Sequence, residues 1–273
     1  MGDPFVLAGR TALITGAGGG IGRALAQALA RRGCHLALAD IDAAGLSETA
    51  RLLPAGLRIS QHRLDVGDRE AIASLPAAIR AVHPGLDLLV NNAGVALGGT
   101  FDQVAEADFE WLIGINFWGV VRMTRAFLPL LRESPDARIV NLSSLYGLIA
   151  PPGQTAYAAS KFAVRGFSHA LAHELAGSSV GVTVVHPGGV ATRIAYSARL
   201  PADIAPEEGA RGRALANSYL KLAPERAAEI ILRAVERRRA RVLVGTDARI
   251  VALLERLMPA AYWPVLTRLM RRP

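Results

Sequence analysis

Short apolar runs alternate with longer amphipathic stretches along most of this 273-residue chain. Most of the runs are apolar at almost every position, as is typical of strands buried on both faces of a parallel sheet. We expect seven strands, at residues 11–15, 35–40, 58–66, 87–91, 138–143, 181–186 and 241–245. Helical spacing occupies the stretches between them, among others at 22–33, 69–82 and 108–133. This alternation predicts a doubly wound α/β fold, with a seven-stranded parallel sheet and helices on both faces.

The alternation contains no internal repeat and no low-complexity linker, which predicts a single domain over residues 1–246. Within it, residues 193–224 interrupt the pattern with many small residues and several arginines. Loops at the carboxyl ends of parallel strands border the ligand crevice of such a sheet. We therefore expect residues 193–224 to form a mobile substrate-binding lid.

Residues 247–273 form a C-terminal extension with the spacing of an amphipathic helix. Pro259 and Pro264 interrupt that spacing, which predicts two short helices with a bend. The first half has one apolar face, formed by Ile250, Leu253, Leu254, Leu257, Met258 and Ala261. The second half mixes aromatic, aliphatic and basic residues: Tyr262, Trp263, Val265, Leu266, Leu269 and Met270 beside Arg268, Arg271 and Arg272. Three roles are open for this tail: membrane contact, cover over the substrate pocket of a neighbouring subunit, or packing on its own domain.

Composition narrows the class of protein. Hydrophobic residues make up 51% of the chain, which favours a well-buried core. No uninterrupted apolar run approaches the ~18 residues of a membrane span, and the first residues lack the features of a secretory signal. Cys34 is the only cysteine, which fits a reducing compartment. We expect a cytoplasmic protein, with peripheral membrane association through the tail as a further option.

The net charge of +8 raises nucleic acid or an acidic carrier protein as a partner. The densest cluster of arginines, at 237, 238, 239 and 241, follows a helical pattern. Cations are favourable at a helix C-terminus, so we expect a solvated helix end there. Neither interleaved aromatic residues nor a recognised binding motif accompany the charge, and we expect no nucleic-acid partner.

Tyr157, Lys161 and Ser144 are the main candidates for chemistry. Tyr157 and Lys161 are four positions apart, so on a helix they share one face. A neighbouring ammonium group favours the phenolate, which predicts a lowered pKa for Tyr157 and a role in proton transfer. Ser144 ends an apolar strand and would donate a hydrogen bond to a substrate oxygen. Ser143 would point to the opposite face of that strand.

A glycine-rich turn between the first strand and the first helix predicts a dinucleotide site. Gly16, Gly20 and Gly22 let the backbone approach a pyrophosphate at the helix N-terminus. Asp40 ends the second strand, where a carboxylate accepts hydrogen bonds from a ribose hydroxyl and repels a 2′-phosphate. The expected cofactor is therefore NAD. A plain helix N-cap is the competing interpretation, and it suits Asp42 better than Asp40.

These motifs occur in one order: TGAGGGIG at 15–22, NNAG at 91–94, Asn116, the serine–tyrosine–lysine set, and HPGGVAT at 186–192. The set resembles the short-chain dehydrogenase/reductase family, in its compact single-domain branch. The resemblance implies a Rossmann-type fold and hydride transfer between NAD and an alcohol or ketone. It implies that Tyr157 exchanges the alcohol proton and that Lys161 holds the nicotinamide ribose. Asn116 would hold a water linking Lys161 to solvent.

The same resemblance assigns further cofactor contacts. Ile21 would cover the phosphates, and Asp65 with Val66 would close the third strand beside the adenine ring. Asn92 would lie on the adenosine side, although NNAG would also stabilise the centre of the sheet. Val190 and Thr192 would face the nicotinamide carboxamide.

Three functions are open. The leading one is an NAD-dependent oxidoreductase for a lipophilic secondary alcohol or ketone, such as a steroid, retinoid, aryl or alkyl alcohol. A β-ketoacyl-carrier-protein reductase is the second, although Asp40 disfavours the NADPH that such enzymes generally use. A catalytically silent dinucleotide sensor or scaffold is the third, although such proteins typically lose the tyrosine or the lysine.

His169 and His173 share a helix face but lack the glutamate directly after the first histidine that a helical zinc motif needs, so we expect no metal site. Family members usually pair the helices that correspond here to residues 111–131 and the Tyr157 helix. A homodimer or homotetramer is the expected assembly. Trp111, Phe117 and Trp118 have helical spacing, which indicates core or interface.

Overall fold

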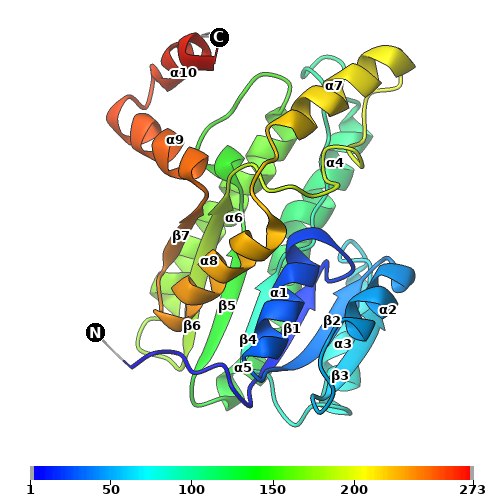
Figure 1. Cartoon of the computed structure of the whole chain (residues 1–273), viewed down its shortest axis with the longest axis vertical. Helices are drawn as coiled ribbons and strands as arrows, with labels where there is room; N and C mark the ends of the chain where they lie inside the picture. Colours follow the sequence, from blue (N-terminus) through cyan, green and yellow to red (C-terminus); the bar gives the residue numbers. More distant parts are fainter. Residues whose placement is uncertain (1–2, 271–273) are drawn as a thin grey trace.

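The computed structural model describes residues 3–270, so Arg271 and Arg272 of the predicted tail lie outside the described residues. One seven-stranded parallel sheet runs through it in the order β3-β2-β1-β4-β5-β6-β7 (Figure 1). The strands are β1 (Thr11–Thr15), β2 (His35–Asp40), β3 (Ile59–Arg63), β4 (Leu88–Asn91), β5 (Ala137–Leu142), β6 (Val180–Pro187) and β7 (Arg241–Val244). The predicted sheet is confirmed. Only β3 is clearly shorter than expected, because Asp65 and Val66 lie in the turn after it.

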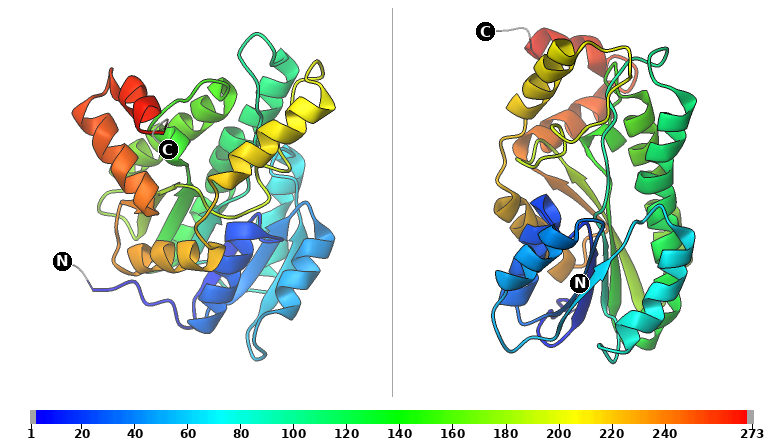
Figure 2. Two further views of the ribbon diagram at one scale, coloured as in Figure 1. Left: turned by 45° about the horizontal axis from the view of Figure 1, so that its top comes forward. Right: turned by 90° about the vertical axis from the view of Figure 1, so that its right-hand side faces the viewer.

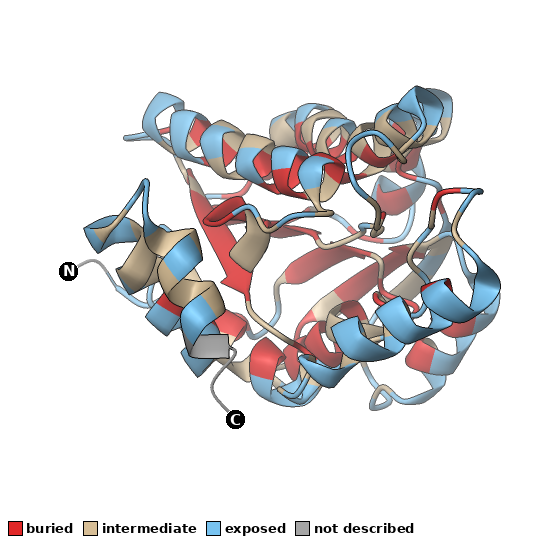
Figure 3. Cartoon of the chain, turned by 90° about the horizontal axis from the view of Figure 1, so that it is seen from above, coloured by how far each residue is buried: buried red, intermediate tan, exposed pale blue. Residues whose placement is uncertain are grey.

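Helices cover both faces of the sheet (Figure 2). The helices are α1 (Gly20–Arg31), α2 (Ala43–Arg51), α3 (Arg69–Arg80), α4 (Glu106–Ile113), α5 (Gly119–Glu133), α6 (Thr155–Glu174), α7 (Pro206–Ser218), α8 (Pro224–Glu236), α9 (Thr246–Leu257) and α10 (Tyr262–Met270). Hydrophobic side chains of α1 and α8 form one core cluster against the sheet. Those of α3, α5 and α6 form a second cluster on the opposite face. The sheet is therefore the buried middle layer, as the burial colours show in Figure 3.

The first βαβ unit shows how local sequence sets these elements. The five residues of β1 are all buried, in keeping with their continuous apolar run. Gly33 has a φ of +79°, which ends α1. Around it, the amide of Cys34 donates to the carbonyl of Leu29 and the amide of Gly33 to Ala30. This is the left-handed helix ending that glycine favours.

The long helix expected from residue 108 contains an interruption. A π-helical turn at Gly114–Trp118 separates α4 from α5. A single turn of this kind places one extra residue in the helix and changes the direction in which the later side chains point. The interruption carries Asn116, whose side chain is completely buried.

The expected lid contains helix α7 and is fastened to the body at two places. Leu97 and Arg199 form a parallel bridge, and Val190 forms another with Leu222. The Arg199 guanidinium also lies 2.6 Å from Asp108 and 3.7 Å from the centre of the Trp111 ring. Specific contacts therefore fasten the segment, which lies beyond the carboxyl ends of the strands in Figure 2.

The arginine cluster at 237–241 is more than a solvated helix end. Arg238 adopts a left-handed backbone with a φ of +54°. Its guanidinium donates two hydrogen bonds of 2.7 Å to Asp136, which also pairs with Arg10. The solvated interpretation is wrong for Arg238, because the last turn of α8 brings it back to the start of β5.

The tail forms the two predicted helices, α9 and α10, with the bend at Pro259. Pro264 does not break α10, because it lies in the first turn, where a backbone N–H would have no acceptor within the helix. None of the helices in residues 3–270 combines the length and apolar character that a membrane span requires.

Candidate active site

The candidate residues converge where the strand order reverses, between β1 and β4. In an open parallel sheet this is the crevice at which ligands bind. The glycine turn follows β1, NNAG follows β4, Ser144 follows β5 and HPGGVAT begins at the end of β6. Four segments that lie far apart in sequence therefore meet at one edge of the sheet.

The glycine turn is built for close approach of backbone groups. Gly16 and Gly20 have φ values of +68° and +51°, which favour glycine. A Cβ at Gly22 would overlap the carbonyl oxygen of Gly16 and lie 2.7 Å from the Asn92 amide nitrogen. Within residues 3–270, no side chain caps the first turn of α1. Its free N–H groups, which come directly after this turn, fit a phosphate ligand.

Asn92 holds the turn in place. Its amide nitrogen donates to the carbonyls of Thr15 and Gly16, at 2.9 and 3.1 Å. The Thr15 hydroxyl accepts from the backbone amides of Asn92 and Ala93, at 3.0 and 3.1 Å. The side chain of Asn92 is thus engaged with protein backbone, which is the sheet-stabilising alternative weighed for NNAG.

Asp40 lies directly beside the glycine turn. Its carboxylate accepts hydrogen bonds from the amides of Gly18, at 2.8 Å, and Asp42, at 2.9 Å. Asp42, in turn, caps α2 by accepting from the amide of Gly45 at 3.0 Å. The N-cap interpretation therefore holds for Asp42, whereas Asp40 joins the end of β2 to the glycine turn.

The remaining cofactor candidates surround the same crevice. Asp65 is exposed and accepts from the amide of Gly67 at 2.7 Å, and Val66 is buried against Gly119. Val190 is 3% exposed, and Thr192 lies so near the turn that a Cβ on Gly20 would meet its methyl group at 3.1 Å. The segment after β6 therefore closes one side of the glycine turn. Ile21 packs partly buried against the core on the α1 side.

Tyr157, Lys161 and Ser144 come together as expected. Ser144 is close enough to Tyr157 to act on the pKa of its phenol, and the Lys161 ammonium lies 5.6 Å from the centre of the Tyr157 ring. Lys161 donates to the carbonyl of Leu142 at 3.2 Å. Ser143 donates to the carbonyl of Lys161 at 2.8 Å and is buried. Only Ser144 of the serine pair is therefore available to a substrate.

The pKa of Tyr157 shifts in the direction opposite to the one expected. Burial raises it to about 12, the hydrogen bond with Ser144 acts against that rise, and Tyr146 adds to it. Burial also lowers the pKa of Lys161, to about 8. The expected lowering fails because desolvation outweighs an ammonium that is bonded to Leu142 instead of the phenol. Tyr157 is thus a protonated phenol at neutral pH.

Asn116 is locked by backbone contacts. Its side-chain oxygen accepts from the amide of Val95 at 2.8 Å, and its nitrogen donates to the carbonyl of Val95 at 3.0 Å. A Cβ at Gly94 would lie 3.1 Å from that oxygen and 3.4 Å from the Lys161 nitrogen. Asn116 and Lys161 therefore flank the same glycine, with no room for a larger residue between them.

Sequence reasoning missed three residues that shape the site. Besides Thr15, Arg23 donates to the carbonyl of Gly18 at 2.6 Å and pairs with Glu48 at 2.7 Å. Asp247 accepts from the amide of Gly189 at 2.7 Å and so holds the HPGG segment from the start of α9. Arg23 directly follows the glycine motif at 15–22, and this position could have indicated it. Nothing in the local sequence indicated Asp247, whose partner lies 58 residues away.

His169 and His173 are both exposed on α6. Among the residues that the structure describes, no group of three histidine, cysteine, aspartate or glutamate side chains has the arrangement of a metal site.

Comparison with known proteins identifies relatives of the whole chain. The family model described as short chain dehydrogenase matches residues 10–202. The SadH protein of Mycobacterium tuberculosis is 45% identical over 261 residues, which cover 93% of this chain and 92% of that protein. A short-chain dehydrogenase/reductase from Burkholderia phymatum, solved in complex with NAD, has 31% identity and a TM-score of 0.86, with 98% of each chain covered. A short-chain dehydrogenase from Mycobacterium paratuberculosis, also bound to NAD, has 28% identity and a TM-score of 0.76, covering 88% of this chain and 97% of that one.

The crowding at Gly22 gives a test that needs no assay of activity. Gly22→Ala should destabilise the protein by roughly 1–3 kcal/mol, because its methyl group would overlap the Gly16 carbonyl. Gly19→Ala is the matched control, since an added Cβ there meets no described atom within 4 Å and the φ of −168° suits any residue. Urea unfolding of both variants measures the difference. Equal stability of the two would contradict the packing described for the turn.

Proposed function

This chain belongs to the short-chain dehydrogenase family, and from that premise we propose that it is an NAD(H)-dependent oxidoreductase that interconverts a lipophilic secondary alcohol and its ketone. The observation that carries the proposal is the convergence of the glycine turn with Ser144, Tyr157 and Lys161 at one edge of the sheet. Bound NAD would supply hydride acceptance and, when reduced, hydride donation. The protein's share is to hold the substrate and move one proton.

Tyr157 is the proposed proton carrier. Its phenol is protonated at neutral pH, because burial raises its pKa to about 12, so it can give a proton to a ketone oxygen during reduction. In the oxidative direction the phenolate must accept the alcohol proton, and Lys161 is the cation on the same helix face that would stabilise it. Ser144 would donate its hydroxyl to the substrate oxygen and stabilise charge that develops there. Asn116 would fix the position of Gly94 beside Lys161.

The proposed cofactor contacts line the crevice. Gly16, Gly20, Ile21 and Gly22 would hold the pyrophosphate at the start of α1. Asp40 would hold the adenosine ribose, because its carboxylate already borders the turn at Gly18. The remaining proposed contacts are Asp65 and Val66 at the adenine, Asn92 along the adenosine, Lys161 and Tyr157 at the nicotinamide ribose, and Val190 and Thr192 at the carboxamide.

A lipophilic substrate suits the wall beside Tyr157. That side chain packs with a cluster formed by Leu97, Leu112 and Ala156, together with Val95, Val104, Phe109 and Trp111. A substrate with hydrocarbon surface would bind more tightly here, because that surface is buried against the apolar wall. Steroid-like, retinoid-like and aryl or alkyl alcohols are the compounds to screen with NAD by absorbance. Turnover in that screen separates an oxidoreductase from a silent dinucleotide sensor, and turnover of free alcohols without a carrier separates it from a carrier-protein reductase.

We also propose a homodimer or homotetramer built on α5 and α6. Trp118, at the end of the π turn, is 47% exposed, and Phe162 on α6 is 39% exposed. Large apolar side chains on neighbouring helices favour burial in a partner. The catalytic domain proposed for residues 1–246 would then present these helices to its copy.

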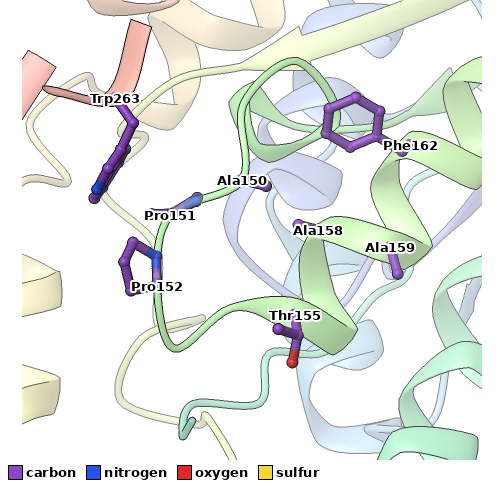
Figure 4. A pocket seen from close by; sticks show the side chains of 8 residues that line it. All are labelled: Ala150, Pro151, Pro152, Thr155, Ala158, Ala159, Phe162 and Trp263. Carbon is purple, nitrogen blue, oxygen red and sulfur yellow. The ribbon is translucent and has the colours of Figure 1, made fainter. Parts of the chain in front are cut away.

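The two tail helices suit different roles. α10 packs on its own chain: the Tyr262 hydroxyl accepts from the amide of Ala150 at 3.1 Å, and Trp263 borders an apolar cavity of about 500 Å³ with Pro151, Pro152 and Phe162 (Figure 4). α9 instead leaves Ile250, Leu253 and Leu257 exposed, beside the exposed Arg249 and Arg256. The part of the tail that fits an anionic membrane surface is therefore α9, whereas α10 braces the loop between Ser144 and Tyr157.

Replacing Tyr157 tests the proton carrier. Tyr157→Phe should lower kcat about 100-fold or more, the usual size of a lost general acid, while the variant still binds NADH, because the other proposed cofactor contacts remain. Tyr146→Phe is the matched control, because its ring lies 6.0 Å from that of Tyr157, edge to face, in the same wall. Steady-state kinetics and NADH fluorescence measure both variants. More than about a tenth of the activity left in Tyr157→Phe, a loss of under roughly 1.4 kcal/mol, would exclude the assignment.

Cofactor preference depends on Asp40. Asp40→Ala combined with Ile41→Arg should raise the ratio of kcat/KM for NADP to that for NAD by about tenfold or more, since a repulsive charge goes and a phosphate partner arrives. Ile41 is 59% exposed, so the arginine has room. Asp40→Asn alone isolates the charge, because it keeps an oxygen for the Gly18 amide. A parent enzyme that already prefers NADP would contradict the proposal.

Truncation after Met258 tests α10 and spares Asp247, which holds Gly189. The shortened protein should show a raised KM for lipophilic alcohols with NADH affinity unchanged, because the loop at Ala150 loses its brace. It should keep whatever binding to anionic vesicles the full chain shows, since α9 remains. Tyr262→Phe removes only the hydroxyl and serves as the finer variant. Unchanged KM in the truncated enzyme would show that α10 merely packs on the surface.

A further inference from the structure

His186 occupies a position between the substrate side and the cofactor side of the site. It is the residue before Pro187 at the end of β6, and its side chain is 0% exposed. The chain continues from it into Gly188, Gly189 and Val190, the segment proposed to meet the nicotinamide. Its own ring points to the neighbouring strand, toward Ser144. The functions assigned to the other candidate residues give this ring no role.

The contact with Ser144 is a hydrogen bond to backbone. Nδ1 of His186 lies 3.0 Å from the carbonyl oxygen of Ser144. A carbonyl oxygen can only accept, so Nδ1 carries the proton. The same carbonyl accepts from the amide of Gly147 at 3.0 Å, which closes the short helical turn Leu145–Gly147. Both lone pairs of the Ser144 carbonyl are therefore in use.

The opposite side of the ring makes no hydrogen bond to the described residues. Nε2 is buried and has no hydrogen-bond partner in the part of the chain that the structure describes. A buried nitrogen without a partner costs free energy, so the ring is kept for the contact that Nδ1 makes. The pKa of His186 is lowered to about 4, mainly by burial; the hydrogen bond with Ser144 acts against this shift, and the nearby Arg241, Arg165 and His169 add to it, so the ring is neutral.

Other contacts fix the rest of this turn. Arg165 donates to the carbonyl of Gly147 at 3.2 Å, and Ser143 donates to the carbonyl of Lys161 at 2.8 Å. The Ser144 hydroxyl accepts from the amide of Tyr146 at 3.1 Å, which leaves its own proton free to be donated. The peptide plane of Ser144 is held from β6 by His186 alone among these groups. That plane joins Ser144 to the turn Leu145–Gly147, so its rotation would break the hydrogen bond from the Tyr146 amide and release the hydroxyl from its direction.

We propose that His186 is a positioning residue for Ser144: its Nδ1–H, donated to the Ser144 carbonyl, sets the direction in which the Ser144 hydroxyl meets the substrate oxygen. The inference rests on the proposed function, since it assigns the hydroxyl of Ser144 to the substrate. It also couples the two halves of the site, because the strand end that carries His186 leads directly to the nicotinamide segment.

The first test uses the unaltered protein. Long-range proton–nitrogen NMR spectra of protein labelled at its six histidines should show one ring with the proton on Nδ1 and no titration between pH 5.5 and about 8. The signal is assigned by its absence in His186→Asn. A proton on Nε2 of His186 would overturn the proposal, because Nδ1 could then donate nothing to the carbonyl.

The second test is kinetic, with NAD and the most active secondary alcohol of the screen. His186→Leu removes the donor at similar volume and should lower kcat at least about tenfold with NADH affinity within twofold. His186→Asn keeps a donor at the same distance along the side chain and should retain most of kcat. In a Ser144→Ala background, His186→Leu should have no further effect, because the group that it positions is gone.

Each other outcome has a distinct meaning. Losses that multiply in the double variant, or a His186→Leu enzyme with normal kcat, would overturn the positioning role. If the His186→Leu protein fails to fold, the histidine tautomer and the His186→Asn kinetics decide. A loss of kcat in His186→Asn would overturn the positioning role even with Nδ1 protonated in the parent. Normal kcat in Ser144→Ala would instead overturn the proposed function of Ser144, with the histidine tautomer unaffected.

Discussion

The hydroxyl of Thr15 joins the two halves of the sheet at the point where the strand order reverses. It accepts from the amides of Asn92 and Ala93, and Asn92 in turn donates to the carbonyls of Thr15 and Gly16. These bonds bring the glycine turn and the end of β4 to one fixed separation. From Ala93 the chain passes to Gly94, against which Asn116 and Lys161 both pack. The geometry of the candidate site therefore depends on this small network between β1 and β4.

Burial sets the electrostatics of the same site. Tyr157 and Lys161 are both shifted toward their neutral forms, the phenol upward and the ammonium downward in pKa. Desolvation disfavours charge on either group, and it outweighs their attraction at this distance. Lys161 is buried, whereas Ser144 and Tyr157 are only partly buried. A substrate that covers them would exclude the remaining water and strengthen the hydrogen bonds that they donate.

Elements beyond the sheet connect to the site through single contacts. Asp247, at the start of α9, holds Gly189, and Tyr262, in α10, holds Ala150. Arg199 fastens the lid segment to α4 through Asp108 and Trp111. Asp247 and Tyr262 end on backbone amides of loops that border the crevice, whereas Arg199 ends on side chains of α4. Segment 193–224 and the tail are therefore joined to the surroundings of the site without a contact to Gly16 or Gly22.

The sequence alone determined the elements and the motifs. The alternation of strand and helix patterns predicted all seven strands, glycine spacing predicted the turn after β1, and the offset of Tyr157 from Lys161 predicted their shared helix face. These features depend on residues within a few positions of one another, so local pattern is sufficient. The tertiary structure decided the rest: the raised pKa of Tyr157, the π turn that buries Asn116, the pairing of Arg238 with Asp136 and the packing of α10 on Ala150. The residues that bury these groups or bond to them come from distant segments, in two cases 102 and 112 residues away. A local sequence pattern cannot indicate which distant segments the fold brings together.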